Sequence, residues 1–510
     1  MPRLWRHLLS SLPALPALRE REGDGRGRLG QWRRPLGVYG GQASHARVLP
    51  WIHFGQGPDE GRSYPCRHGA TRRRQRGGRG GGDGSCHGSK GDPGTPERRE
   101  GRLVLLPACG SCSRLGSARR REPMREVAII GAGMIPFGKF PDYPAARMGG
   151  DAAEMALRQA GIRATDIEAT FLGNTGGNAP NLAQRVNGEI GITGIPAFNH
   201  ENACASSSAA FRQAVLAVGH GMHDYVLVVG VENMTCHIAS GRLPSGPLVL
   251  PHGANLEADN GMMMPAVFAL LGSQHMAEYG TTREQFARVA VKNHAHSAHN
   301  PYAQYRKVFT LEEILNSRMV CDPLTLLQCC PIGDGAAAVV VTTAANARRH
   351  TTKPVYVAAS VLTSGKYKAS VQGAVQIEAC ARAARECYEA AGIGPEDVDV
   401  VELHDCFSIH ELVAYEDLGF CPKGEGGRFI DEGLSDYGGK VVVNPSGGLL
   451  CKGHPIGATG VAQLVEIVWQ LQGLCGARQV PGAKVGLTHN GGGFGPGNEP
   501  GAMSITILKV

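Results

Sequence analysis

What the 510-residue sequence lacks already excludes several classes of protein. No apolar run reaches the roughly 18–20 residues that a membrane-spanning helix needs, so the sequence excludes a spanning protein. No apolar signal-peptide core with a cleavage site stands out either. The 15 cysteines are an odd number in a long chain, so we expect no disulfide scaffold. The sequence therefore favours a reducing compartment.

Lysine is almost missing from the first quarter of the chain. Residues 1–123 hold 23 Arg, 1 Lys and 10 acidic residues, which gives this segment a net charge of +14. The net charge of the whole chain is +7, so residues 124–510 carry a net charge of −7. This split removes the argument for a nucleic-acid partner of the acidic part. The Arg/Gly-rich segment cannot bury a core. We interpret residues 1–123 as a disordered extension, or as an upstream region that is included because the start site is misassigned and the true start is Met124. A targeting segment and a nucleic-acid-binding arm are the alternatives.

Two short motifs lack the partners that would give them a function. Cys109 and Cys112 form a CxxC, but no second close pair follows, so we expect no zinc site there. Gly131-Ala-Gly133 follows the predicted strand Val127–Ile130. It lacks the third glycine and the following helix of a dinucleotide fingerprint, so we predict a turn.

An internal duplication organises the rest of the chain. A predicted helix, a turn and a strand follow one another around Gly161 and Asp166, and the same pattern returns around Gly392 and Asp397. Both pairs of residues are 231 positions apart. Equal offsets across several elements indicate a repeat, and strands that alternate with helices indicate an α/β fold of two facing layers.

The duplication suggests domain boundaries. Residues 124–243 and 328–350 form the predicted first half, and residues 351–510 form the second. The stretch between them, 244–327, contains few periodic segments, so we interpret it as an inserted loop domain.

Cys204 is the first candidate for chemistry. It follows the strand-like segment Ile195–Asn199 and stands at the start of a predicted helix, beside Ala and Ser. The free N–H groups and the dipole of a helix N-terminus favour a thiolate. We therefore expect a lowered pKa and a nucleophilic role, with an inert buried cysteine as the alternative.

His454 occupies a similar position in the second half. It lies between Gly453 and Pro455, before the predicted helix Val461–Leu471. The duplication places His454 opposite Cys204, within reach as its base.

Two further motifs lie at strand ends of the second half. His404-Asp-Cys406-Phe ends the duplicated strand, where ligands of such sheets bind. His489-Asn-Gly491-Gly492-Gly ends the last strand. Backbone N–H groups of Gly491 and Gly492 would form an oxyanion hole, and a plain turn is the alternative.

Together these motifs resemble the thiolase superfamily. The resemblance covers residues 124–510. It rests on four motifs in the family's order: the Cys204-Ala-Ser-Ser loop, HDCF, GHPIGATG and HNGGG. The HDCF motif is similar to that of sterol-carrier-protein thiolases and bacterial acetyl-CoA acetyltransferases. The resemblance implies a five-layer αβαβα fold of two halves with an inserted loop domain. It also implies a homodimer or dimer of dimers, acyl-CoA substrates with coenzyme A as substrate, and no bound cofactor or metal.

The resemblance also implies residue roles. Cys204 matches the nucleophile that takes the acyl group, and His454 matches the residue that activates it and holds a thioester oxygen. The chain departs from degradative thiolases, because HDCF replaces Asn-Glu-Ala-Phe and His489 replaces their late cysteine. The roles implied are therefore acid/base for Cys406 and oxyanion donor for His404, with His489 as the competing acid/base.

The expected reaction is thiolytic cleavage of a 3-oxoacyl-CoA, or the reverse Claisen condensation. Alternatives are a retro-aldolase acting on a 3-hydroxyacyl-CoA side chain, which Cys204 argues against, and a non-catalytic acyl or lipid carrier. A small zinc-containing OB-fold partner subunit is a further implication, whereas we expect no companion lipid-transfer domain. The expected location is the bacterial cytoplasm, or a peroxisome or mitochondrion in a eukaryote.

Overall fold

The computed structural model describes residues 124–175, 179–236, 263–351, 353–366, 375–494 and 499–510. The predicted extension, residues 1–123, lies outside this part of the chain, as do residues 237–262 at the start of the predicted loop domain. No helix within the described ranges is both long and apolar enough to cross a membrane.

Ten strands form one continuous sheet in the order β10-β9-β11-β12-β8-β1-β7-β4-β2-β3. The strands of the first half are β1 (Val127–Met134), β2 (Ala169–Gly173), β3 (Ala197–His200), β4 (Tyr225–Asn233) and β7 (Asp334–Thr343). Those of the second half are β8 (Val355–Thr363), β9 (Val400–Glu402), β10 (Val442–Val443), β11 (Val485–Phe494) and β12 (Pro500–Lys509).

The strand order confirms the predicted duplication. Read from its own edge, the first half runs β3-β2-β4-β7-β1, and the second half runs β10-β9-β11-β12-β8 through the equivalent strands. The directions also agree, since β2 is parallel to β3 and β4, and β9 is parallel to β10 and β11. The two halves join through a short antiparallel pairing of β1 with β8.

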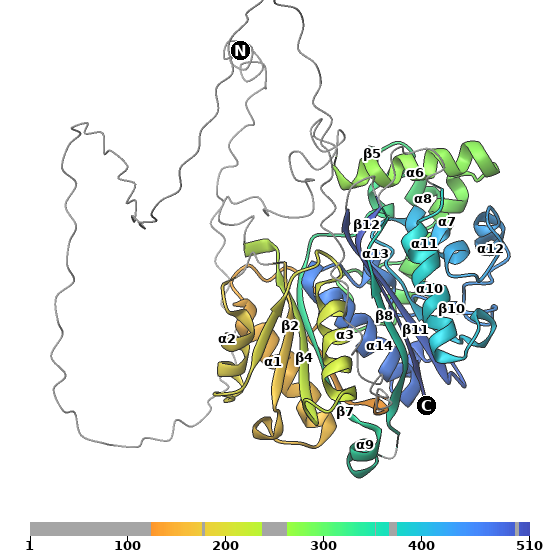
Figure 1. Ribbon diagram of the computed structural model, residues 1–510. Coiled ribbons are helices and arrows are strands. Elements are labelled where there is room, and N and C mark those ends of the chain that lie inside the picture. Colours follow the sequence, from red (N-terminus) through yellow and green to blue (C-terminus); the bar gives the residue numbers. More distant parts are fainter. Residues whose placement is uncertain (1–123, 176–178, 237–262, 352, 367–374, 495–498) are drawn as a thin grey trace, which may run out of the picture. The chain divides into compact units, whose positions relative to one another are not determined.

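Helices complete five layers, which confirms the predicted αβαβα class. The helices of the first half are α1 (Ala145–Ala160), α2 (Leu182–Glu189), α3 (Ser206–Gly219) and α9 (Ala344–His350). Those of the second half are α10 (Glu378–Ala391), α11 (Ser408–Asp417), α12 (Gly426–Asp431), α13 (Gly448–Cys451) and α14 (Thr459–Gln472). The helices α3 and α14 pack against each other between the strands of the two halves, and α1 and α10 cover the outer faces (Figure 1).

The sequence explains why these elements begin and end where they do. Both α1 and α10 end at a glycine in the left-handed region, Gly161 (φ 65°) and Gly392 (φ 63°), as expected for helix C-caps. Strand β7 lies between two helix layers, so its run of Ala and Val is buried on both faces.

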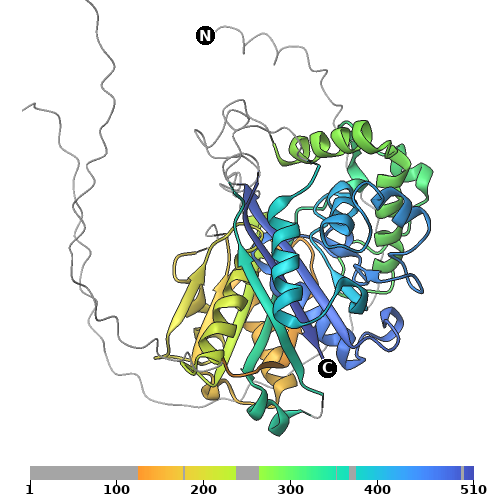
Figure 2. The same cartoon turned by 45° about the vertical axis from the view of Figure 1, so that its right-hand side comes forward.

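The segment predicted as loops contains helices. It holds α6 (Met264–Tyr279), α7 (Arg283–Ser297), α8 (Leu311–Leu315) and the small hairpin β5 (Met319–Cys321) and β6 (Leu324–Thr325). The loop-rich interpretation of this segment is therefore wrong for the described part. The even spread of apolar residues around α6 hid its helical period. These green helices gather beside the second-half helices, where α7 packs on α11, α12 and α13 (Figure 2).

Two glycine motifs lie inside strands. This corrects the turn predicted at Gly131 and the position of HNGGG, which we expected at the end of its strand. Gly131 and Gly133 belong to β1, because that strand continues to Met134. A Cβ atom at Gly131 would lie 2.1 Å from the carbonyl oxygen of Ala156, so the glycine allows α1 to approach β1 closely. The HNGGG motif lies within β11 rather than after it, and it pairs with β12.

Candidate active site

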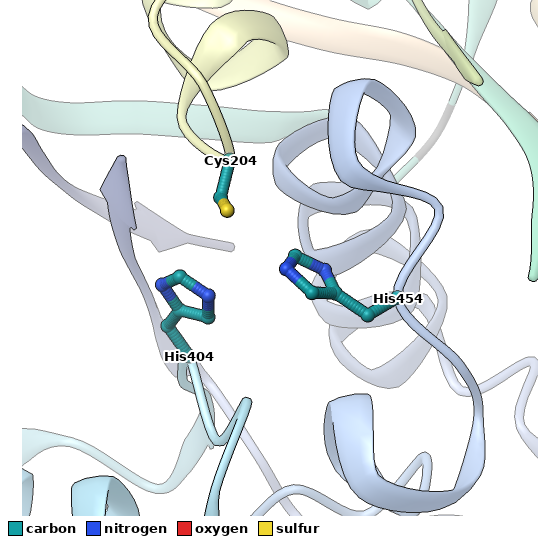
Figure 3. Close-up of side chains that lie close together, drawn as sticks. All are labelled: Cys204, His404 and His454. Atoms are coloured by element: carbon teal, nitrogen blue, oxygen red, sulfur yellow. The ribbon is translucent and has the colours of Figure 1, made fainter. Parts of the chain in front are cut away.

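Three predicted site residues meet between the two halves of the fold. Cys204 precedes α3, His404 follows β9, and His454 lies ahead of α14 (Figure 3). One nitrogen of each ring and the cysteine sulfur lie within 4.8 Å of one another. All three side chains are buried, with 4–6% of their surface exposed. The figure shows the sulfur and both rings pointing into one space.

The hydrogen bonds of His454 leave it a lone pair for Cys204. Its Nδ1 lies 2.7 Å from the hydroxyl oxygen of Thr459, and that hydroxyl donates to the carbonyl of Pro455 at 3.1 Å. The hydroxyl has one hydrogen, so its oxygen must accept the Nδ1–H hydrogen of His454. The ring therefore carries its proton on Nδ1 and a lone pair on Nε2. Burial lowers the pKa of His454 to about 3, so the ring is a neutral base.

His404 has the opposite tautomer. Its Nδ1 accepts the backbone N–H of Gly491 at 3.0 Å. The proton of the neutral ring must then lie on Nε2, a buried atom without a hydrogen-bond partner in the structure. Burial and the nearby histidines hold the pKa of His404 well below its usual value. An unpaired N–H donor therefore faces the space beside the Cys204 sulfur.

The expected low pKa of Cys204 is wrong. Burial raises the pKa of this thiol to about 12, although the backbone N–H of Gly493 and its own N–H face the sulfur and oppose the shift. The N–H groups of Ala205 and Ser206 donate to carbonyls of the preceding turn, Asn202 and Ala203, rather than to the sulfur. Cys204 is therefore a neutral thiol that needs a base in order to react.

The predicted oxyanion role of Gly491 and Gly492 also needs correction. The N–H of Gly491 is bound to His404, as described above. Gly492 serves close packing, since a Cβ atom there would lie 2.1 Å from the carbonyl oxygen of Asn202. The glycine whose N–H faces the Cys204 sulfur is Gly493, one residue further along β11.

Cys406 and His489 occupy different positions relative to the cavity. Cys406 lines the cavity beside Cys204, and its Sγ lies 3.9 Å from Nδ1 of His410. His489 is fully buried and is not part of the cavity wall. The backbone N–H of His404 donates to Nδ1 of His489 at 3.4 Å, so His489 supports the HDCF loop from behind.

Asp405 anchors the HDCF loop between its two neighbours. Its carboxylate accepts the backbone N–H groups of Leu449 (2.6 Å) and Leu450 (3.2 Å) and the side-chain amide of Asn293 (2.8 Å). Burial, followed by the negative charge of Glu411, raises the pKa of Asp405 to about 8. Asp405 points away from the cavity and fixes the backbone that carries His404 and Cys406.

Each half of the fold holds the reactive loop of the other half. The side-chain amide of Asn490, on β11, donates to the carbonyl of Cys204 at 3.0 Å. In the reverse direction, the carboxylate of Glu232, on β4, accepts the N–H of Gly457 at 3.0 Å in the loop of His454. The two bonds fix the separation of nucleophile and base.

The site opens into an apolar cavity of about 260 Å³. One wall comes from α6 and the β5–β6 hairpin, and another comes from the end of β11. Its apolar lining includes Met264, Phe268, Leu326, Ile332, Phe494 and Met503.

Cys204, His404 and His454 also have the residue types of a Cys-His-His zinc site. A metal on Nε2 of His404 would need the lone pair of that atom. The ring proton would then move to Nδ1, where it would oppose the N–H of Gly491 at 3.0 Å. The hydrogen bonds therefore favour proton transfer over metal binding.

Sequence reasoning missed several residues that complete the site. Thr459 sets the tautomer of His454, Asn490 and Glu232 hold the loops, and His410 contacts Cys406. Two of them had a signal in the sequence, because Thr459 belongs to GHPIGAT and His410 follows Cys406 by four residues.

Fold and site together define a class: a duplicated five-layer α/β protein whose buried thiol has a basic histidine on one side and a donor histidine on the other. Residues 127–345 match the thiolase N-terminal domain, and residues 363–499 match the thiolase C-terminal domain-like family. The chain belongs to the thiolase family and is an acyltransferase of that family.

Three similar proteins show the range of relatives. Acetyl-CoA acetyltransferase of Methanothermobacter thermautotrophicus is 43% identical over 377 residues, which cover 73% of this chain and 97% of the relative. Sterol carrier protein 2 of Bos taurus is 40% identical, over 76% of this chain and 73% of that protein. The solved structure of the Ltp2-ChsH2(DUF35) aldolase is 28% identical with a TM-score of 0.64, over 76% of this chain and 98% of that one.

Proposed function

We propose that the enzyme cleaves a 3-oxoacyl-CoA with coenzyme A, or runs the reverse Claisen condensation, through a thioester on Cys204. The observation that carries this proposal is the pair of opposite tautomers. His454 offers a lone pair and His404 offers an N–H hydrogen to the space around one sulfur. A nucleophile with a base on one side and a donor on the other suits attack on a carbonyl carbon.

The first half-reaction forms the thioester. Nε2 of His454 takes the thiol proton as the Cys204 sulfur attacks the 3-keto carbon. The bond between C2 and C3 breaks, and its electron pair leaves on C2 as an acetyl-CoA-type enolate, while the shortened acyl group stays on Cys204 as a thioester. The Nε2–H of His404, and His454 once protonated, donate to the oxygens that gain negative charge.

Cys406 supplies the proton that completes cleavage. Its S–H bond breaks and a C–H bond forms at the α-carbon of the enolate, which leaves a thiolate on Cys406. That thiolate takes the proton of the incoming coenzyme A, whose sulfur attacks the Cys204 thioester. The position of Cys406 in the cavity wall supports this role over His489, which lies behind the HDCF loop.

The retro-aldolase is the alternative, because one solved relative is an aldolase. That reaction needs no nucleophilic cysteine, so it does not explain why a fixed base lies within 4.8 Å of the Cys204 sulfur. Mass spectrometry of the protein with a panel of straight, branched, aromatic and steroidal 3-oxoacyl-CoAs tests the proposal. We expect an acyl adduct on the Cys204 peptide, absent in Cys204→Ser and present in the remote variant Cys387→Ala. Turnover without any adduct, with release of an aldehyde or ketone, would support the aldolase.

We propose that two copies associate through the edge of the sheet. Strand β3 ends the sheet at the first half, and its Phe198 is 43% exposed. Pairing with a second copy would cover this edge strand and its aromatic side chain. Light scattering would measure the mass, and Phe198→Lys should shift a dimer toward monomer.

Other expectations from the sequence stay predictions. The partner is a small zinc-containing OB-fold subunit, and the name of the Ltp2-ChsH2(DUF35) aldolase joins two components in that relative. We also keep the expectations of catalysis without a resident metal or cofactor and of a cytoplasmic location. Co-purification of the tagged chain, followed by metal analysis, tests the partner and the metal together.

A further inference from the structure

His410 is a buried histidine beside the site without a role in the mechanism above. It lies in the first turn of α11, has 3% of its surface exposed, and lines the cavity. Its ring contacts the rings of His404, His489 and Phe268 at centroid distances of 5.4, 5.6 and 5.1 Å. Its Nδ1 lies 3.9 Å from the sulfur of Cys406, within hydrogen-bond range for sulfur.

The hydrogen bonds of His410 differ from those of the other three histidines of this region, of which His404 and His454 line the cavity and His489 does not. Thr459 fixes the proton of His454, the N–H of Gly491 fixes that of His404, and the backbone N–H of His404 fixes that of His489. No partner lies within hydrogen-bond distance of Nε2 of His410. The carbonyl of His404 faces the ring, and since Nε2 has no partner, the hydrogen of the neutral ring lies on Nδ1, beside the sulfur of Cys406.

Cys406 needs such a neighbour. In the proposed reaction it alternates between thiol and thiolate inside a buried site. Negative charge on the nearby Cys330, Cys204 or Asp405, when any of these groups is ionised, would oppose a thiolate on Cys406. The backbone N–H of Phe407 favours the thiolate, and burial holds the pKa of Cys406 well above its ordinary value.

We propose that His410 is the positioning residue of Cys406: its Nδ1–H donates to the sulfur, weakly while Cys406 is a thiol and more strongly once it is a thiolate. This proposal rests on the acid/base role of Cys406 proposed above. No proton leaves the pair through His410, because the ring keeps its Nδ1–H hydrogen while the S–H proton moves to the substrate carbon. Burial lowers the pKa of His410 to about 4, which keeps the ring neutral in both states. The carbonyl of His404 also faces this ring and favours a hydrogen on it.

The test removes the nitrogen and keeps the shape. His410→Phe fills the same space without a hydrogen bond, and His410→Asn keeps an amide near the position of Nδ1. The matched control is His294→Phe, because His294 is buried to a similar extent, has a pKa lowered to about 4, and lies outside the cavity wall. Circular dichroism and thermal unfolding select the folded variants.

The first readout is the pKa of Cys406 itself, measured from its alkylation rate against pH by mass spectrometry in a Cys204→Ala background. A hydrogen bond to a charged group changes the ionisation constant of that group by about one to two powers of ten. We therefore expect His410→Phe to raise the pKa of Cys406 by about 1–2 units. His410→Asn should restore part of the shift, and His294→Phe should leave the pKa unchanged. An equal pKa of Cys406 in the parent and in folded His410→Phe would overturn the proposal.

The second readout separates failure of this inference from failure of the proposed function. It is the exchange of the α-protons of an acyl-CoA in deuterated water, measured against pH with Cys204 intact. His410→Phe should lower exchange about 10–100-fold and move the profile toward alkaline pH, with acylation of Cys204 retained. If Cys406→Ala exchanges normally, the acid/base assignment is wrong. If Cys406→Ala abolishes exchange while His410→Phe leaves rate and profile unchanged, the role of His410 is wrong.

Discussion

The loops of Cys204 and His454 occupy equivalent places in the two halves, each ahead of a central helix, α3 or α14. They differ in chemistry, since one carries a neutral thiol and the other a neutral base. Neither residue is reactive by itself at neutral pH, because burial keeps the thiol protonated and the imidazole uncharged. The comparison teaches that the duplication produced one site from two halves.

A second pair of equivalent positions shows how the cavity arose. Gly173 and His404 are 231 residues apart, the offset of the duplication. Gly173 is the last residue of β2, and His404 lies just after the equivalent strand β9. A Cβ atom at Gly173 would lie 2.3 Å from the backbone of Ser207, so the first half has α3 packed against this point. In the second half the same position carries a histidine that faces the cavity. The first half is therefore closed at the position where the second half lines the cavity.

Among the changes to the two loops, removal of the Cys204 thiol should lower activity most. Cys204→Ala leaves the base without a partner, and we expect thiolysis to fall by about 10³-fold or more. His454→Asn should cause a loss of similar size, because the two residues act as a unit. Steady-state thiolysis measures both. Full retro-aldol activity in Cys204→Ala would assign the enzyme to the alternative reaction.

The second largest effect should distinguish the two acid/base candidates. Cys406→Ala should lower turnover about 10²–10⁴-fold while Cys204 still becomes acylated, because only proton transfer is lost. His489→Ala should cost less, through movement of the loop that it supports. The measurement is α-proton exchange in deuterated water. Exchange that survives in Cys406→Ala and disappears in His489→Ala would give the role to His489.

The alkylation of Cys204 should depend steeply on pH. A pKa of about 12 means that the thiolate is scarce at neutral pH, so the rate should rise about tenfold per pH unit between pH 8 and 11. Iodoacetamide labelling of the substrate-free enzyme, read by mass spectrometry of the Cys204 peptide, gives this profile. If the alkylation rate reached a plateau below pH 8, the pKa of Cys204 would be lowered, as its position at the start of a helix had suggested.

The two bonds between the halves should have smaller and similar effects. Asn490→Ala frees the loop of Cys204, and Glu232→Ala frees the loop of His454; we expect each to lower kcat about tenfold through misplacement of the pair. Ser360→Ala is the matched control, because it removes a buried hydrogen bond to Thr506 in the second-half strands. If the control lowers kcat as much as either variant, the loss reflects stability rather than geometry.

Removal of residues 1–123 should have the smallest effect. This segment is rich in Arg and differs in net charge from the rest of the chain, and the first strand of the fold begins at Val127. A chain that starts at Met124 should therefore keep the activity and oligomeric state of the full chain. Thiolysis assays and light scattering compare the two. Loss of either property would show that the segment takes part in folding or assembly.

The five layers and the place of His404 in the site were implied by the family resemblance. The sequence pattern by itself predicted the α/β class, the two duplicated halves and a pair of Cys204 with His454. These follow from local patterns, because equal offsets, glycine caps and loops ahead of helices repeat within short windows of sequence. It also indicated Cys406 and His489 as candidates without deciding between them.

Only the tertiary structure decided how the site residues behave. The pKa of Cys204 is raised rather than lowered, because burial by distant segments outweighs the local helix start. The tautomers of His404 and His454 depend on Gly491, which is distant in sequence, and on the hydroxyl of Thr459. Desolvation and hydrogen bonding are set by residues that approach through space, and a one-dimensional pattern does not record which groups those are.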